Sequence, residues 1–363
     1  MSADKKWQLE LDEYIRQGEP DKKEKSEAWE VAIGLQAVDG LQTSEYLLET
    51  AKEHIEGNIT IDEVERRIAS YYEEQRERNE LDADTHEADT VSSRIAKILG
   101  EKSFKFSSTE WLNIHKRLFD GMLKYAGRIR DYNISKHEWV LKGESVIYAP
   151  YDGIRETMDY DFNTEKQFDY KGLSLEEVIK HLAKFTSDIW QIHPFCEGNT
   201  RATAIFMIKY MNTLGFKVNN DIFKEHSWYF RNALVRANYS NIKEGIYSTN
   251  KFLEMFFSNL LMGTDYELKN RFLHLDYKKE ETHTAKSEVS NGKICLKGLP
   301  IEEKAVLEVI IEKPEITQKE IASKIGKSER TVRNKINSLK EKGILERVNG
   351  KRNGKCVYTG RQK

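Results

Sequence analysis

The sequence has few prolines and no long apolar run, and both absences narrow the fold class. Only 5 of the 363 residues are proline, which leaves room for long, uninterrupted helices. No stretch of about 18 or more apolar residues occurs, so we expect no transmembrane helix and no membrane partner. The N-terminus is polar and lacks the apolar core of a secretory signal peptide. Together these absences favour a mostly α-helical protein outside the membrane.

Cysteine is also scarce. Cys196, Cys295 and Cys356 are odd in number and widely spaced, so they fit neither a zinc site nor a disulfide framework. A reducing cytoplasm is therefore the expected location. The length predicts two or three domains, and the 33% charged content is typical of a soluble globular chain.

The net charge of −2 conceals an uneven distribution along the chain. Residues 1–92 hold 11 Lys/Arg against 25 Asp/Glu, whereas residues 327–363 hold 12 Lys/Arg against 3 Asp/Glu. We therefore expect the two ends to have different partners.

Periodicity and composition divide the chain into four parts. Residues 1–80 read as short helices, with Thr60 as a possible N-cap. Residues 90–265 read as a compact helical domain, interrupted by two β-rich runs around a glycine that predict a hairpin at 138–148. Ser174 and Glu177 form a capping-box signature inside that domain.

The last two parts are a linker and a small domain. Residues 266–298 are polar and charged, which predicts a linker. Residues 299–360 show three helical segments at about 301–312, 317–325 and 328–341, followed by a glycine-rich hairpin, and Thr317 with Glu320 forms a second capping box.

Four consecutive residues predict an anion site between two helices. A helix is expected to begin near Thr200, so its free N–H groups point back into the loop. Gly198 allows close approach of the backbone to an anion. Asn199 can donate to one phosphate oxygen, and Arg201 can form a bidentate hydrogen bond with phosphate oxygens. An arginine in a first helical turn opposes the helix dipole, and a bound anion would explain that placement.

Two residues of the same loop predict catalysis. His193 has the intrinsic pKa of a general base, and Glu197 is a hard oxygen ligand suited to Mg²⁺ beside phosphate. Each residue also has an ordinary explanation: His193 as a helix-end residue, Glu197 as a solvated carboxylate, and Gly198 with Asn199 as a turn. The combination within nine residues is what favours function.

The segment HPFCEGNTR, residues 193–201, resembles the motif of the Fic family, and the resemblance extends over about 90–265. It implies attack of a protein hydroxyl on the α-phosphate of ATP, with AMP transferred and pyrophosphate released. His193 would be the base and Glu197 the Mg²⁺ ligand. Nucleotide binding would fall to Phe195, as a core anchor, with Gly198, Asn199, Thr200 and Arg201.

Other segments also resemble this family. The run AGRIRDYNIS resembles the segment before the family's flap, and the hairpin resembles the flap itself. The flap would align a segment of the target protein through Val140, Leu141, Lys142 and Gly143, although the hairpin is equally explained as a structural cover. The helix around 229–239 would contribute to the adenosine pocket.

The motif has two departures from the family pattern. Thr200 replaces the usual Gly or Lys, although its backbone N–H remains available. Ala204 stands where a second arginine is frequent, which removes a γ-phosphate contact and the usual partner of an inhibitory glutamate.

The N-terminal helices resemble the small VbhA-type antitoxins that partner Fic toxins. Leu35 and the pair Asp39-Gly40 align with the inhibitory motif, and both key positions differ from it. We expect either weak inhibition, inhibition through another contact, or a purely structural helical cap.

The C-terminal part resembles a winged helix-turn-helix domain and predicts DNA as a partner. Its third helix and wing carry basic and amide side chains suited to phosphates and base edges, namely Arg330, Arg333, Asn334, Lys335, Lys351 and Arg352. A protein-docking winged helix is the alternative.

The expected function is protein adenylylation, with three alternatives left open. The same loop could transfer UMP or phosphate, or the Fic-like core could only sense nucleotide for a DNA-binding regulator. The sequence names neither the target protein nor the oligomeric state, and a homo-oligomer remains open.

Overall fold

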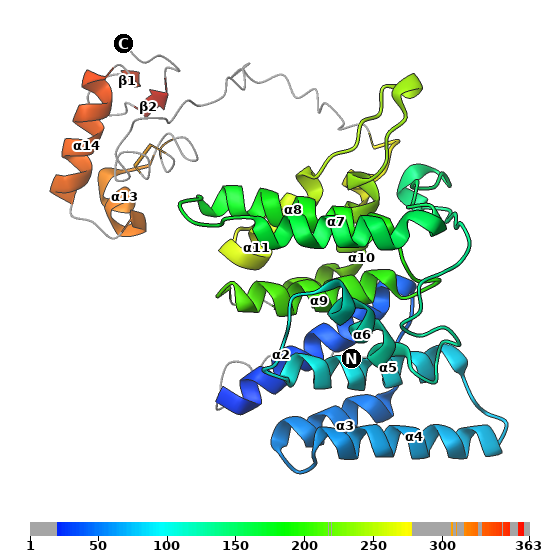
Figure 1. The fold of residues 1–363 in the computed structure, drawn as a ribbon. Coiled ribbons are helices and arrows are strands. Elements are labelled where there is room, and N and C mark those ends of the chain that lie inside the picture. The colour runs from blue at the N-terminus through cyan, green and yellow to red at the C-terminus, as the bar shows by residue number, and fades with distance from the viewer. Residues whose placement is uncertain are drawn as a thin grey trace. The chain divides into compact units, whose positions relative to one another are not determined.

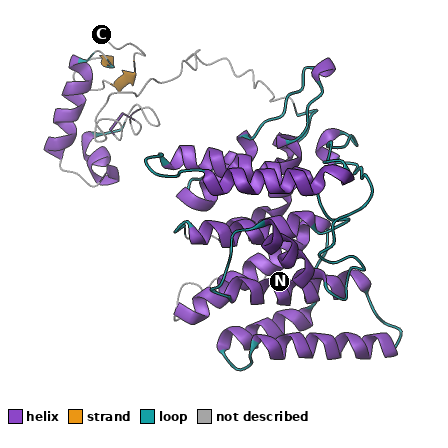
Figure 2. Ribbon diagram, viewed as in Figure 1, coloured by secondary structure: helices purple, strands orange, loops and turns teal. Residues whose placement is uncertain are grey.

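The computed structural model describes residues 20–216, 218, 220–277, 306–307, 310, 316–325, 329–342, 344–348 and 355–358. The chain divides into two compact units, one ending at Lys279 and one beginning at Glu280. The described part of the first unit is helices and loops, and strands are drawn only in the second (Figures 1 and 2). None of the helices described is long and apolar enough to cross a bilayer.

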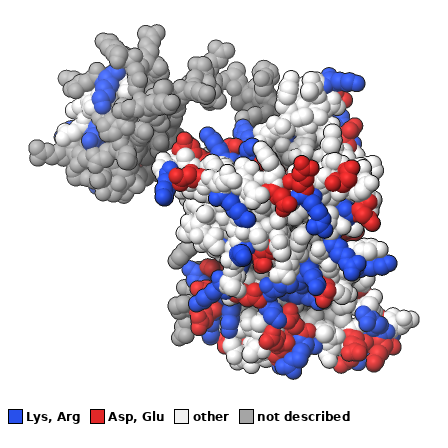
Figure 3. All heavy atoms as spheres, in the orientation of Figure 1, with Lys and Arg blue, Asp and Glu red and all other residues white. Residues whose placement is uncertain are grey.

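The first unit is a layered stack of helices (Figure 1). On the face drawn in Figure 3, acidic and basic side chains are interspersed over this unit rather than separated. Its α-helices and short 3₁₀ turns (η) are α2 (Pro20–Gly34), η1 (Leu35–Asp39), α3 (Glu45–Glu56), α4 (Ile61–Glu77), α5 (Ala83–Gly100), α6 (Ser108–Phe119), η2 (Trp139–Leu141), η3 (Tyr151–Gly153), α7 (Ile154–Gln167), α8 (Leu175–Ile192), α9 (Asn199–Thr213), α10 (Asn220–Ala237), η4 (Ile242–Glu244), α11 (Lys251–Met262) and η5 (Asn270–Leu273).

Side-chain caps set the start of several of these helices. Thr60 accepts from the backbone N–H of Glu63 at the start of α4, which confirms the predicted cap. Ser174 and Glu177 form both bonds of the predicted capping box at the start of α8. These local signals were readable because a cap involves residues only three positions apart.

The N-terminal helices share their core with the rest of the unit. Trp29 and Leu35 are fully buried and belong to the same apolar cluster as Phe206 of α9. The backbone of Gly34 lies so close to Lys224 of α10 that an added Cβ would sit 2.4 Å from the Lys224 Cα. Residues 20–80 are therefore an integral layer of the unit, and the predicted boundary at residue 80 separates no independent core.

The predicted β-hairpin at 138–148 is wrong. The segment instead contains the 3₁₀ turn η2 and extended backbone, closed by a hydrogen bond from Glu138 N–H to the Glu144 carbonyl. Val140 and Leu141 are fully buried, so their side chains cannot present themselves to a target protein. Burial of this apolar pair forces a compact turn, and Lys142 follows with a positive φ of 61°.

The predicted linker at 266–298 also begins too early. Leu268 and Leu273 are buried, and the N–H of Leu275 donates to the carbonyl of Val140. Residues 266–277 therefore pack against the segment around η2, and Phe272 and Leu275 add to this apolar contact with the core. Residues 278–298 lie outside the described residues.

The described part of the second unit contains α13 (Gln318–Ile325), α14 (Glu329–Glu341), β1 (Leu345–Val348) and β2 (Lys355–Tyr358). The two strands pair antiparallel, with Leu345 opposite Tyr358, as the predicted hairpin requires. The capping box of Thr317 and Glu320 at the start of α13 is confirmed.

Side chains of α14 carry part of the predicted DNA-binding face. Arg333 and Asn334 are exposed and Lys335 is half-buried. Arg330 lies in α14 without a described side chain, and Lys351 and Arg352 lie outside the described residues. Most of the helix predicted at 301–312 is likewise outside them.

Candidate functional site

His193 ends helix α8 in an unusual backbone conformation. Its φ of 48° and ψ of 59° lie in the left-handed region, which few residues other than glycine adopt. The following Pro194 disfavours right-handed helix at position 193, so α8 stops there. The side chain is only 2% exposed. Residues held in such sparsely populated backbone conformations cluster at functional sites.

Hydrogen bonding selects one form of the His193 ring. Its Nδ1 lies 3.0 Å from the carbonyl oxygen of Trp190, so Nδ1 carries the proton and Nε2 keeps its lone pair. Burial, followed by the positive charge of Lys136, holds the pKa of His193 well below its ordinary value. The ring of Tyr148 packs 4.1 Å from the imidazole, centroid to centroid. His193 is therefore a neutral imidazole near pH 7, with Nε2 available as a proton acceptor.

Arg130, whose role the sequence analysis did not assign, fixes the backbone around His193. Its guanidinium donates to the carbonyls of His193 (2.8 Å), Tyr132 (2.6 Å) and Ala149 (2.5 Å), and its own N–H donates to Pro194 (2.8 Å). It is 3% exposed. No helical or strand spacing relates residues 130 and 193, so only the tertiary structure could assign this role.

A buried ion pair also contributes charge near His193. Arg231 of α10 forms a bidentate ion pair with buried Glu138, at 2.6 and 3.0 Å. The charges of Arg231 and Lys136 also lower the pKa of His193. These charges add to the larger effect of burial in keeping the imidazole neutral.

Loop residues 195–199 are held from within. Both ends of the Asn199 side-chain amide bond the backbone of Phe195, its Oδ1 accepting from N–H (3.0 Å) and its Nδ2 donating to the carbonyl (2.8 Å). Asn199 therefore braces the loop, a role that differs from the predicted phosphate donor. Phe195 is buried and stacks on His115 at 3.6 Å, consistent with a core anchor.

His115, which was not predicted, positions the residue expected to bind the metal. Its Nδ1 accepts from the N–H of Gly127, so its Nε2–H donates to the carbonyl of Glu197 at 2.9 Å. Burial lowers the pKa of His115 to about 4, which keeps this neutral form. The Glu197 side chain is exposed and forms no ion pair within the described residues. One free carboxylate fits Mg²⁺, which takes its remaining ligands from phosphate and water.

The start of α9 has the features of an anion cradle. Gly198 has a φ of 73°, and an added Cβ would lie 2.4 Å from the ring of Phe119, so only glycine fits there. The N–H groups of Asn199, Thr200 and Arg201 find no acceptor in the described part of the chain. These unsatisfied donors fit phosphate oxygens.

The Arg201 guanidinium, in contrast, is already engaged. Its Nε lies 2.8 Å from Asp39 Oδ2, an ion pair without hydrogen-bond geometry. Its Nη1 donates to Gln36 (3.0 Å) and its Nη2 to Glu87 (2.7 Å), neither of which was predicted. Gln36 and Asp39 both belong to η1. Asp39, which was predicted as a regulatory position, is therefore in direct contact with Arg201 of the motif.

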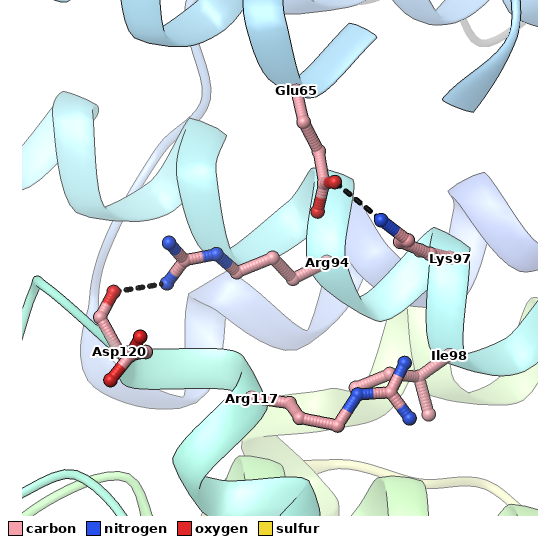
Figure 4. Close-up of a pocket in the computed structure, with 6 residues that line it drawn as sticks. All are labelled: Glu65, Arg94, Lys97, Ile98, Arg117 and Asp120. Carbon is pink, nitrogen blue, oxygen red and sulfur yellow. Dashed lines mark hydrogen bonds and ion pairs between the residues drawn. The ribbon is translucent and has the colours of Figure 1, made fainter. Parts of the chain in front are cut away.

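A charged hollow of about 240 Å³ lies elsewhere in the first unit, between α4, α5 and α6 (Figure 4). Its cations are already paired: Lys97 with Glu65 at 2.6 Å, Arg94 with the Asp120 carbonyl at 2.7 Å, and Arg117 with Glu101 at 2.5 Å. The hollow includes no residue of the loop 193–201, so it does not extend the site.

Comparison with known families matches two segments of the chain. Residues 105–211 match the Fic/DOC family, and residues 303–346 match a winged helix-turn-helix DNA-binding family. Among curated proteins, no match to the sequence was found.

Solved structures similar to this chain include two Fic domains from Bartonella and one Fic family protein. The N-terminal Fic domain of an effector from Bartonella sp. AR 15-3 is 22% identical, with a TM-score of 0.40, covering 49% of this chain and 81% of that one. The N-terminal domain of Bep8 from Bartonella sp. 1-1C is 18% identical, with a TM-score of 0.39, covering 50% and 88%. The protein from Desulfovibrio desulfuricans G20 is 16% identical, with a TM-score of 0.38, covering 100% and 98%.

Proposed function

We propose that the protein is an adenylyltransferase that moves AMP from ATP onto a hydroxyl of a target protein, because residues 105–211 match the Fic/DOC family. Members of this family transfer nucleotide or phosphate groups to proteins. The observation that supports the proposal most is that a neutral His193 and the N–H groups that begin α9 share one loop, and that neither His193 Nε2 nor these N–H groups have a hydrogen-bond partner among the described residues.

The proposed step is an in-line displacement at the α-phosphorus. The target hydroxyl oxygen forms the new O–P bond, its proton goes to Nε2 of His193, and the bond to the β-phosphate oxygen breaks to release pyrophosphate. The N–H groups at the start of α9 hold phosphate oxygens and stabilise their charge. A Mg²⁺ ion held by Glu197 would neutralise further phosphate charge. Catalysis thus depends on positioning and on electrostatic stabilisation.

Labelled ATP tests the proposal directly. The purified protein is incubated with Mg²⁺, a lysate and ATP labelled at either the α- or the γ-phosphate. Label on protein from the α position alone is expected, and His193→Ala should abolish it while His226→Ala should not. Protein labelled from the γ position would instead indicate phosphate transfer, and labelling from α-labelled UTP in preference to ATP would indicate UMP. An H193A variant with wild-type labelling would contradict the enzyme.

We further propose that the N-terminal helices restrain this activity through Arg201. Two carboxylates, Asp39 and Glu87, occupy the motif arginine and place negative charge where phosphate charge would lie. A triphosphate must compete with them for the same guanidinium. Deleting residues 1–80 would remove Trp29 and Leu35 from the core, so a point substitution at Asp39 is the cleaner test.

For the second unit we propose DNA binding. The exposed Arg333 and Asn334 of α14 suit phosphate and base contacts. Binding should weaken steeply as salt rises, and Arg333→Ala should reduce the salt slope by about one. A regulator that only senses nucleotide would keep its DNA response in H193A, whereas labelled transfer would be absent from the wild type as well.

A further inference from the structure

A hydrogen bond crosses from the end of α8 to the start of α9. The indole Nε1–H of Trp190 donates to the hydroxyl of Thr200 at 3.0 Å. The two residues are 1% and 6% exposed, so this bond is shielded from water. Inside a protein, an indole N–H left without an acceptor is costly, and Thr200 supplies that acceptor.

Trp190 also contacts the base directly. Its carbonyl lies 3.0 Å from Nδ1 of His193 and accepts the His193 backbone N–H at 3.1 Å. Its indole ring packs edge-on against the imidazole, with centroids 4.8 Å apart. Trp190 therefore fixes which nitrogen of His193 is protonated through its backbone carbonyl, and its indole ring packs against one side of the imidazole.

Thr200 stands on the anion side of the same loop. Its side chain is directed inward to Trp190, while its backbone N–H, in the first turn of α9, has no acceptor in the part of the chain described. The side-chain type matters, because glycine has no acceptor and lysine carries only donors. Threonine at position 200 thus links the anion cradle to the residue that holds the base.

We propose that Trp190 and Thr200 are positioning residues, whose hydrogen bond sets the placement of His193 relative to the phosphate-binding amides of α9. The inference rests on the proposed transfer reaction. Attack geometry is sensitive to displacements of about 1 Å, so loosening this link should slow the chemical step more than it weakens nucleotide binding.

The test compares three substitutions on one helix. Thr200→Val keeps the shape but removes the acceptor, and Thr200→Ser restores it. Thr203→Val is the matched control, because the Thr203 hydroxyl is buried and has no partner within the described residues. We expect T200V to lower kcat about tenfold or more with KM for ATP within about twofold, T200S to recover most of that loss, and T203V to match the wild type.

A double substitution isolates the pair. If the hydrogen bond is the cause, Trp190→Phe with T200V should lose clearly less than the two single losses combined, because each single change already breaks the same bond, while the altered ring contact with His193 is present in both Trp190→Phe variants. Additive losses would overturn the proposal, as would a T200V enzyme with wild-type kcat or a T203V enzyme that is equally slow.

NMR of the His193 ring separates this proposal from the proposed function. In the wild type, the Nδ1 proton should exchange slowly, and in T200V it should exchange at least several-fold faster while T203V leaves it unchanged. If no variant transfers any nucleotide but T200V still loosens the ring, the positioning role holds and the transfer reaction fails. Unchanged exchange in T200V overturns the positioning role whatever the activity.

Discussion

The two ends of the loop from His193 to Arg201 are prepared in opposite ways. At His193, Nδ1 is bonded to the Trp190 carbonyl and the backbone is held by Arg130, while Nε2 has no hydrogen-bond partner among the described residues. At Arg201 the side chain that could bind phosphate is bound to Gln36, Asp39 and Glu87. If His193 is the base and Arg201 binds phosphate, as proposed, the base needs no rearrangement, whereas the Arg201 guanidinium must leave or share its carboxylate partners.

The cause of this difference lies in what each end packs against. His193 is buried, and Lys136, Arg231 and Arg130 place positive charge around it, so that burial and these charges together lower its pKa and favour a neutral ring. Arg201 faces the N-terminal helices and α5, which present two carboxylates. The proposed base and the proposed restraint can therefore be tested by separate substitutions.

The largest expected effect is on catalysis at the base end. His193→Ala should lower kcat by about 10³-fold, because a positioned general base contributes roughly 10²- to 10⁴-fold. ATP affinity should stay near the wild-type value, since the α9 amides remain in place. Steady-state kinetics with a nucleotide-binding assay measure both. A large loss of ATP affinity in H193A would show that the two ends are not separable.

The next largest effect is on stability, at the Arg201 end of the loop. Arg201→Ala leaves Asp39 and Glu87 without their shared partner and should reduce the free energy of unfolding by about 2 kcal/mol, less than for a fully buried pair because both carboxylates are partly exposed. Thermal unfolding measures it, with the exposed Arg155 replaced by Ala as control. Equal stability of R201A and R155A would mean that the ion pairs contribute nothing.

Weakening the contacts of Arg201 with its carboxylate partners should raise transfer activity. Asp39→Ala removes one competitor for the Arg201 guanidinium and should increase kcat/KM for ATP by up to about tenfold, the equivalent of 1.4 kcal/mol. Asp84→Ala, an exposed aspartate at the start of α5, is the control. If D39A transfers no faster than D84A, the N-terminal helices are structural only.

The smallest expected effect is on pH dependence. Because the pKa of His193 is lowered, its neutral form persists as the pH falls through the ordinary histidine value of about 6.5, and proton uptake begins only at lower pH. The kcat should change by less than about twofold between pH 7.5 and 6.5. A pH profile of single-turnover rates measures this. A half-maximal rate near pH 6.5 would indicate an ordinary, solvated histidine.

Sequence alone predicted the features that depend on near neighbours. The caps at Thr60 and Ser174 and the capping box at Thr317 each join residues three positions apart. The helical layout follows from apolar spacing. The prediction failed where an apolar pair fits two local structures. Val140 and Leu141 are as compatible with a β-strand as with a buried turn, and the structure places them in a buried turn. Leu268 and Leu273 were likewise missed, because the segment was read together with the charged run that follows it.

Residue types within nine positions were thus enough to single out the loop, with its base, its carboxylate and its glycine-led helix start. Only the tertiary structure decided which groups those side chains meet. Gln36 and Glu87 are 165 and 114 residues from Arg201, and Arg130 is 63 from His193. Contacts at such separations follow from how helices pack in three dimensions, and no local spacing in the chain encodes them.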